Sequence, residues 1–80
     1  MSGRDPAVAF SLRRLLGRRV RRRRKQMKLT QETASQRSGI YWRHWQKIEA
    51  GEVNVTLETL ARLARALDVH VYVLLKPEVV

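Results

Sequence analysis

Cysteine is absent from this 80-residue chain, so disulfide bonds and thiolate metal sites are both excluded. The absence also fits a reducing compartment such as the cytosol. No apolar run reaches the roughly 18 residues that a membrane-spanning helix needs. Nor does an apolar segment typical of a signal peptide follow Arg13 and Arg14. We therefore expect a small cytoplasmic protein without a membrane-spanning segment.

Acidic residues are also scarce. The chain has 7 Asp and Glu against 17 Lys and Arg, which gives a formal net charge of +10. Ten of the basic residues lie between positions 13 and 28, a segment that contains no acidic residue. A surplus of this size favours a polyanionic partner, which can be nucleic acid, an acidic protein or an anionic membrane surface. Charge alone does not choose among these partners.

The first predicted helix spans residues 6–28. Asp5 and Pro6 suit its start, because Asp caps helix N-termini and Pro is tolerated at the first helical position. Its apolar residues recur at helical spacing and form one face, which consists of Leu12, Leu16, Val20 and Met27. Arg23 falls within this apolar stripe, so its side chain must extend past its neighbours to a polar environment.

Three shorter helices are predicted to follow, over residues 31–37, 41–50 and 57–67. Thr30 and Thr56 precede the first and the last of them and are expected to cap them. Gly39 and Gly51 suit the left-handed backbone conformation that commonly ends a helix. The last helix has a strong apolar stripe of leucine and alanine residues. These patterns predict a mainly α-helical domain.

The tail changes character at residue 69. Valine alternates with other residues in VHVYVLL, and this β-branched alternation favours a strand over residues 69–75. A lone strand leaves its backbone donors and acceptors unpaired. The same strand of a second copy, antiparallel about a two-fold axis, would pair them; an extended tail packed on the helices is the alternative. The residues expected to hold the dimer are Val69, Val71, Tyr72, Val73 and Leu75.

Two helices joined by a tight turn with glycine, all within about 20 residues, are the pattern of a helix-turn-helix motif. The turn here is SGIY, at 38–41. Four sequence blocks accompany it, namely LTQE at 29–32, GI at 39–40, KIEAG at 47–51 and TLETLARLARAL at 56–67. Through the joint order and spacing of these blocks, residues 16–69 resemble the Cro/repressor-type, or XRE-like, helix-turn-helix family.

The resemblance implies five helices, with a supporting helix at 31–37 and a recognition helix at 41–50. It implies that Gln31 bonds to a DNA phosphate and that Arg24 pairs with Glu49, which would tie the first helix to the recognition helix. It also implies which residues lie against the major groove, namely Tyr41, Trp42, Arg43, Gln46 and Lys47.

Several positions depart from the family pattern. Arg23 stands where an aliphatic residue is usual, Ala34 where a larger aliphatic residue is usual, and Ser35 where alanine is usual. Tyr41 stands where Ser or Thr often caps the recognition helix. The predicted C-terminal strand takes the place of the fifth helix, and in this respect the chain resembles the family members found as dimeric antitoxins.

Helical periodicity turns Arg43, Gln46 and Lys47 outward from the recognition helix, opposite the apolar side chain of Trp45. Arg43 can bond bidentately to guanine and Gln46 to adenine, and Lys47 can reach a guanine or a phosphate. Trp42 lies at the flank of this face. There it either packs on the supporting helix or covers a thymine methyl group or a sugar.

The arginine run at 18–24 has three interpretations. It extends the phosphate contacts, it meets an acidic partner protein, or it only keeps the surface soluble. Phosphate contact is the favoured one, because it would add affinity for any DNA sequence with a steep dependence on salt. The residues expected to make these contacts are Arg18, Arg21, Arg22 and Lys28.

Catalytic and metal-binding patterns are missing from the sequence. There is no Ser/His/Asp or Cys/His set at suggestive spacing and no glycine-rich phosphate loop. Neither His44 nor His70 has a second histidine or an acidic cluster near it in the sequence. We therefore expect no enzymatic activity, no cofactor and no metal.

These patterns together predict a DNA-binding domain at 6–68, between a flexible segment at 1–5 and a strand and tail at 69–80. The predicted function is a sequence-specific repressor that binds an inverted-repeat operator in double-stranded DNA as a homodimer. Such a protein would be bacterial or phage-encoded, cytoplasmic and associated with the nucleoid. The alternative is an antitoxin or adaptor whose main role is to bind a toxin or another protein, with repression of its own promoter.

Overall fold

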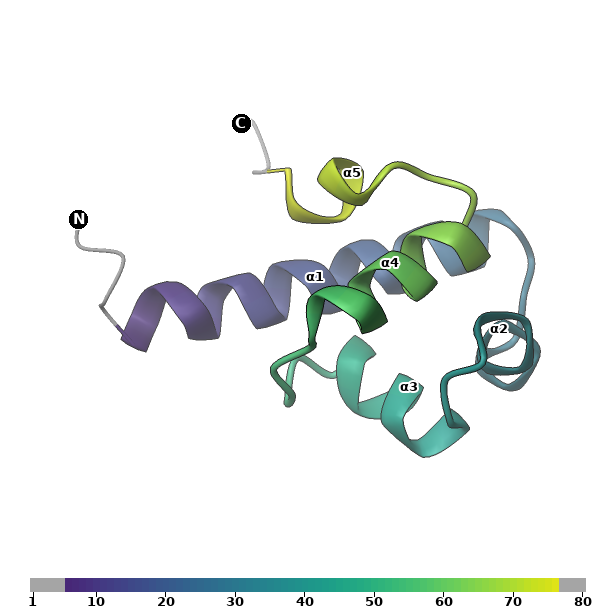
Figure 1. Cartoon of the computed structure of the whole chain (residues 1–80), viewed down its shortest axis with the longest axis horizontal. Helices are drawn as coiled ribbons and strands as arrows, with labels where there is room; N and C mark the ends of the chain where they lie inside the picture. Colours follow the sequence, from purple (N-terminus) through teal and green to yellow (C-terminus); the bar gives the residue numbers. More distant parts are fainter. Residues whose placement is uncertain (1–5, 77–80) are drawn as a thin grey trace.

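The computed structural model describes residues 6–76 and contains five helices in this range (Figure 1). They are α1 Pro6–Gln26, α2 Gln31–Ser38, α3 Trp42–Glu49, α4 Leu57–Ala66 and α5 Val71–Leu75. The mainly α-helical class predicted from the sequence is confirmed. The predicted flexible segment at 1–5 and the end of the predicted tail, 77–80, lie outside the described residues.

α1 is the longest helix and extends along the molecule, with α3 packed on one side of it and α5 on the other (Figure 1). The apolar stripe predicted for α1 faces inward, since Leu16 and Val20 are buried and Met27 packs against the core. Leu12, nearer the start of the helix, remains 46% exposed. Within residues 6–76, no helix combines the length and apolar character that a membrane crossing requires.

Side chains from all five helices meet in one hydrophobic core. Its buried members are Leu16, Val20, Ala34, Ile40, Trp45, Ile48, Leu60, Leu63, Ala64, Leu67 and Leu74. Trp45 has no exposed surface, and Ile48, one turn later, is 1% exposed. Full burial of such a side chain contributes about 1.5–3 kcal/mol. These two residues therefore anchor α3 to the rest of the domain.

The helix ends follow the local signals in the sequence. The hydroxyl groups of Thr30 and Thr56 accept hydrogen bonds from the backbone N–H groups of Thr33 and Thr59, each at 3.0 Å. Gly39 ends α2 in the left-handed conformation, with a φ of 74°. These caps satisfy backbone groups that a helix end otherwise leaves unpaired.

Arg23 lies within the apolar stripe of α1, and its charged side chain reaches a polar partner at the end of α4. Its Nε donates a hydrogen bond of 2.8 Å to the carbonyl oxygen of Leu67, the C-terminal cap of α4. Helix C-termini carry unpaired carbonyl groups and partial negative charge, so a cation is stabilising there. The side chain that breaks the apolar pattern thus links α1 to the end of α4.

The strand predicted over residues 69–75 is not present, and Val71–Leu75 forms α5 instead. Short apolar runs are compatible with either structure, since Val71, Leu74 and Leu75 also share one face of a helix. In the helix Leu74 is fully buried, and residues 6–76 contain no strand with which residues 69–75 could pair. The predicted dimer residues Val69, Val71, Tyr72, Val73 and Leu75 lie on or beside α5.

Gly17 allows α1 and α3 to approach closely. A β-carbon at this position would lie 2.6 Å from the carbonyl oxygen of Ile48 and 2.6 Å from that of Glu49. Both neighbours are backbone atoms at the end of α3, so they have little freedom to move aside. Glycine is therefore required where the two helices meet.

Replacement of Gly17 by alanine is expected to lower the free energy of unfolding by about 2 kcal/mol, because the added methyl group overpacks the contact. A decrease would be informative, because replacing glycine by alanine within a helix ordinarily stabilises the helix by about 1 kcal/mol. Urea unfolding followed by circular dichroism measures the difference.

Ser11→Ala, on the exposed face of the same helix, is the matched control. It should change the free energy of unfolding by less than about 0.5 kcal/mol. A Gly17→Ala variant as stable as the native chain would contradict the close approach of α1 and α3.

Candidate nucleic-acid interface

The turn between α2 and α3 is held by the side chain of Ser38, which is fully buried. Its hydroxyl donates a hydrogen bond of 2.9 Å to the carbonyl oxygen of Ser35 and accepts one of 3.1 Å from the N–H of Ile40. Gly39, between them, has the positive φ that a β-carbon would strain. These local bonds fix the direction in which the chain leaves α2 and enters α3.

The outer face of α3 is polar. Arg43, Gln46 and Lys47 are exposed, while Trp45 and Ile48 point into the core. The helix has no acidic residue in its first turn, so no carboxylate there opposes the approach of a phosphate backbone. The division into inner and outer faces follows the predicted periodicity, and contact of the outer residues with DNA remains a prediction.

Glu49, the last residue of α3, joins three helices. Its Oε2 accepts hydrogen bonds from Arg24 Nε at 2.6 Å and from Trp45 Nε1 at 2.5 Å. Its Oε1 accepts from Arg24 Nη2 at 3.0 Å and from Gln31 Nε2 at 3.1 Å. The ion pair implied by the family resemblance is therefore present, with the Arg24 and Glu49 side chains only 11% and 4% exposed.

The charge of Glu49 is stabilised by these donors. Burial by itself raises the pKa of the Glu49 carboxyl group, but the hydrogen bonds from Arg24, Trp45 and Gln31 and the charge of Arg24 outweigh that effect. The net result is a pKa below the ordinary value of a glutamic acid. The carboxylate thus stays ionised at neutral pH and keeps accepting all its bonds.

Gln31 begins α2 and is half-buried. The family resemblance implies a phosphate contact for its amide, and in the structure one amide N–H is bonded to Glu49. An amide nitrogen has two N–H donors, so this bond orients the group while the second donor can bind elsewhere. The structure shows the orientation, and the phosphate contact stays a prediction.

The basic residues predicted to bind phosphates are exposed and lie at different places around the first helix and the turn after it. Arg21 follows Gly17 by four residues and precedes Arg24 by three, so it shares the edge of α1 that faces α3. Arg18 and Arg22 lie further round the helix, away from α3. Lys28 lies after the end of α1, close to the start of α2. Arg21 and Lys28 therefore lie beside the elements that pack on α3, and contact of all four residues with phosphates remains a prediction.

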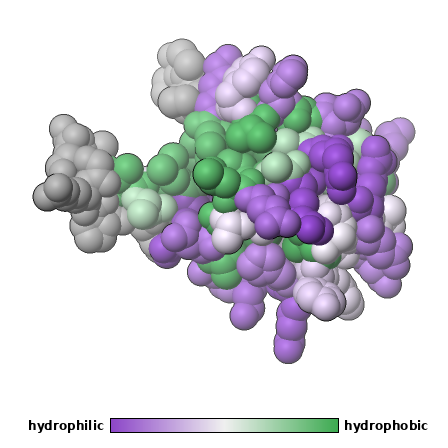
Figure 2. Space-filling view, in the orientation of Figure 1, coloured by the Kyte–Doolittle hydropathy of each residue, from purple (hydrophilic) through white to green (hydrophobic). Residues whose placement is uncertain are grey.

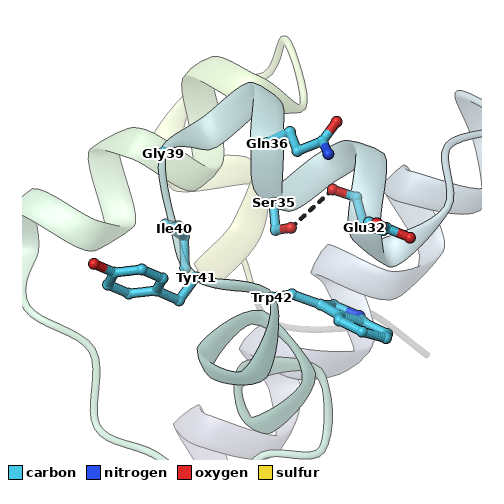
Figure 3. Close-up of a pocket in the computed structure, with 7 residues that line it drawn as sticks. All are labelled: Glu32, Ser35, Gln36, Gly39, Ile40, Tyr41 and Trp42. Atoms are coloured by element: carbon cyan, nitrogen blue, oxygen red, sulfur yellow. Dashed lines mark hydrogen bonds between the residues drawn. The ribbon is translucent and has the colours of Figure 1, made fainter.

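Tyr41 and Trp42 are the exposed aromatic residues at the start of α3. Tyr41 is 87% exposed and gives α3 no side-chain cap, as its departure from the family pattern predicts. Trp42 is 51% exposed and forms one wall of a hollow of about 340 Å³ beside α2. The two rings extend from the turn in different directions (Figure 3).

Two features of the site were missed by reasoning from the sequence. The bond from Trp45 to Glu49 had a signal, because residues four apart lie on one face of a helix. The bond from Gln31 to Glu49 had none, because the two residues are 18 positions apart and meet only through the packing of α2 on α3.

Comparison with known proteins agrees with this geometry. Residues 15–72 match the family model described as a helix-turn-helix domain, and the chain belongs to that family. The restriction-modification controller protein C.AhdI from Aeromonas hydrophila is 34% identical, with a TM-score of 0.75, over 78% of this chain and 94% of its own. Among curated proteins no significant match is found.

Two further solved structures share the fold. The hypothetical transcription factor NHTF from Neisseria is 29% identical, with a TM-score of 0.79, over 82% of this chain and 76% of its own. A regulator of the HTH_3 family from Vibrio cholerae is 21% identical, with a TM-score of 0.79, over 82% of this chain and 37% of its own. The resemblance seen in the sequence is confirmed: the chain is a helix-turn-helix protein of the DNA-binding, non-enzymatic class of transcription regulators.

Glu49→Gln is expected to destabilise the domain at neutral pH by about 3 kcal/mol, because it leaves the buried Arg24 without its counter-charge. The pKa of Glu49 is lowered in the folded state, so its stabilisation is present above the ordinary carboxyl pKa and is lost as the pH falls through the folded value. Urea unfolding at a series of pH values should show the two proteins converging in acid.

Glu52→Gln removes an exposed carboxylate three residues away and serves as the control. Its free energy of unfolding should follow that of the native chain at every pH. A constant difference between Glu49→Gln and the native chain down to pH 2 would contradict the assigned pKa direction.

Proposed function

We propose that this protein is a sequence-specific transcriptional repressor that inserts α3 into the major groove of an inverted-repeat operator as a homodimer. The observation that carries the proposal is the combination of an exposed polar outer face on α3 with a rigid attachment of the same helix through Glu49. The major groove accommodates an α-helix, and its base edges are read by side chains held in fixed positions. A cytoplasmic, nucleoid-associated location follows from this role.

The roles on the reading face follow from side-chain chemistry. Arg43 is assigned a bidentate contact with guanine, and Gln46 a contact with adenine. Lys47 lies one turn after Arg43 and is assigned a guanine or a phosphate. Tyr41 and Trp42 supply apolar contact at the N-terminal edge of the helix, where both are exposed.

Phosphate contacts are assigned around this face. Gln31 stands at the N-terminus of α2, where unpaired N–H groups and the helix dipole favour an anion. Lys28, in the turn just before α2, and Arg21, on the edge of α1 that faces α3, are assigned further phosphates. Arg18 and Arg22 lie further away and are assigned a long-range contribution to the attraction of DNA, which salt screens.

The alternative role is an antitoxin or adaptor that binds a toxin or another protein. It has less support than the repressor role. Its two grounds in the sequence are the C-terminal strand and the arginine-rich first helix, and residues 71–75 are helical. The relative from Aeromonas hydrophila is a restriction-modification controller protein. Its similarity over most of both chains supports a regulatory role for this chain as well.

The homodimer requires a surface other than a paired strand. An apolar surface lies between the first half of α1, the loop before α4 and the end of α5 (Figure 2). It includes Leu12, Val55, Leu57 and Leu75, of which Leu57 is 84% exposed. Contiguous apolar surface of this kind marks an interaction site. We assign it to a second copy of the chain, because an inverted-repeat operator is matched by a two-fold dimer.

Leu57→Glu is expected to convert the dimer into a monomer, because it places a charge in the apolar contact while costing the exposed site little stability. Sedimentation equilibrium measures the mass of each protein. Tyr72→Ser, which changes an exposed residue of α5 outside this surface, should leave the mass unchanged. If Leu57→Glu keeps the native mass, the dimer surface lies elsewhere.

Arg43→Ala is expected to relax specificity at one base pair of each half-site, with a loss of about 1–3 kcal/mol of discrimination. Binding sites selected from random duplexes near physiological salt are compared for the variant and the native chain. If no duplex binds native protein at least about a hundredfold more tightly than bulk DNA, specific readout is excluded.

Arg21→Ala is the companion variant. It should weaken binding to all sequences alike and reduce the slope of log affinity against log salt by about 1, because a phosphate contact carries no sequence information. A change of sequence preference in Arg21→Ala would reverse the roles assigned to the two arginines.

A further inference from the structure

Trp42, at the start of α3, has a large apolar side chain that is only partly buried. It is 51% exposed, whereas Trp45 three residues later is 0% exposed and bonded to Glu49. Among the hydrogen bonds found within residues 6–76, none involves the indole of Trp42. Tryptophan is enriched at binding surfaces, because its ring supplies a large apolar area and its N–H a polar edge.

The indole of Trp42 lies beside a surface hollow next to α2. It forms one wall of the hollow whose other wall is α2, contributed by Glu32, Ser35 and Gln36 (Figure 3). Tyr41 also lines the hollow, but its ring extends in a different direction from that of Trp42 (Figure 3). The hollow is thus a surface recess at the edge of the reading face, next to α2.

The polar groups of the hollow determine what can enter it. Ser35 is buried, and its hydroxyl already donates to the carbonyl oxygen of Glu32 at 2.8 Å, so it has no proton to offer a ligand. Glu32 is exposed, and its carboxylate repels phosphate. The Glu32 carboxylate therefore opposes a phosphate on its side of the recess. An element of the DNA that matches an indole wall beside the base-facing side of α3 is the apolar part of a base edge.

In the major groove that apolar part is the C5 methyl group of thymine. We propose that Trp42 selects a thymine in each half-site by packing its indole against this methyl group. The inference rests on the proposed function and names one base that α3 reads. It also makes Trp42 a determinant of specificity, distinct from the bidentate readers Arg43 and Gln46.

The test begins with binding sites selected by the full native chain from random duplexes. Each thymine of the selected site is then replaced in turn by deoxyuridine, which removes only the methyl group. One position in each half-site should lose affinity about fourfold, the factor expected for the burial of one carbon-sized apolar group. In Trp42→Ala the same replacement should have no effect, because the partner of the methyl group is gone.

Two controls keep the result interpretable. Arg43→Ala should weaken binding yet retain the fourfold methyl effect, since it acts at a different base. Trp42→Gln, which keeps a side chain of moderate length without the apolar ring, should also abolish the effect. Thermal unfolding of each variant shows that the comparison is made on folded protein, and Trp42→Gln replaces Trp42→Ala if the latter unfolds.

The remaining outcomes separate this inference from the proposed function. If a site is selected but no thymine shows a methyl effect, or the effect survives in both Trp42 variants, the inference fails while the proposed function stands. A cytosine selected beside Trp42, with affinity lost in Glu32→Gln, would mean that the recess reads an amino group instead. If the native chain selects no site, the proposed function fails and this inference with it.

Discussion

The hydrogen-bond network around the carboxylate of Glu49 is the interaction on which the position of α3 depends. The carboxylate accepts hydrogen bonds from Arg24 of α1, Gln31 of α2 and Trp45 of α3, so one side chain sets the relative positions of three helices. Both members of the ion pair are almost fully buried, and a buried carboxylate is stable only when its oxygens are bonded. The network therefore tolerates little displacement of α3.

The arginines of α1 fall into two groups, one that bonds to other helices and one that is exposed on the surface. Arg23 and Arg24 turn inward, where one bonds to the end of α4 and the other to Glu49. Arg18, Arg21 and Arg22 are exposed, so they add to the positive field outside the molecule. Part of the basic surplus is thus structural. The net charge of +10 therefore includes side chains, such as those of Arg23 and Arg24, that are bonded within the domain and do not face a polyanion.

Much of the fold could be predicted because its signals are local. Thr30 and Thr56 cap helices, Gly39 takes a left-handed conformation, and the period of α3 separates Trp45 from Arg43 as expected. Such features depend on neighbours one to four residues away, and a sequence pattern describes those neighbours directly. The exposed groups of the site were predictable for the same reason.

The features that the sequence did not predict depend on contacts between segments that are far apart in the chain. The tail at 69–75 has a pattern compatible with either a strand or a helix, and packing of Leu74 against the core decided in favour of α5. Gly17 resembles any helix glycine until the end of α3 lies against it. The hollow beside Trp42 likewise exists only once α2 and α3 are packed together.

By itself the sequence determined the helical class, the helix caps, the turn between α2 and α3 and the side of α3 that faces outward, because short-range stereochemistry and helical period govern all four. Only the tertiary structure decided the form of the tail, the need for glycine at position 17 and the set of donors around Glu49. These depend on which surfaces meet when helices far apart in the chain pack at close range, and no local pattern specifies that.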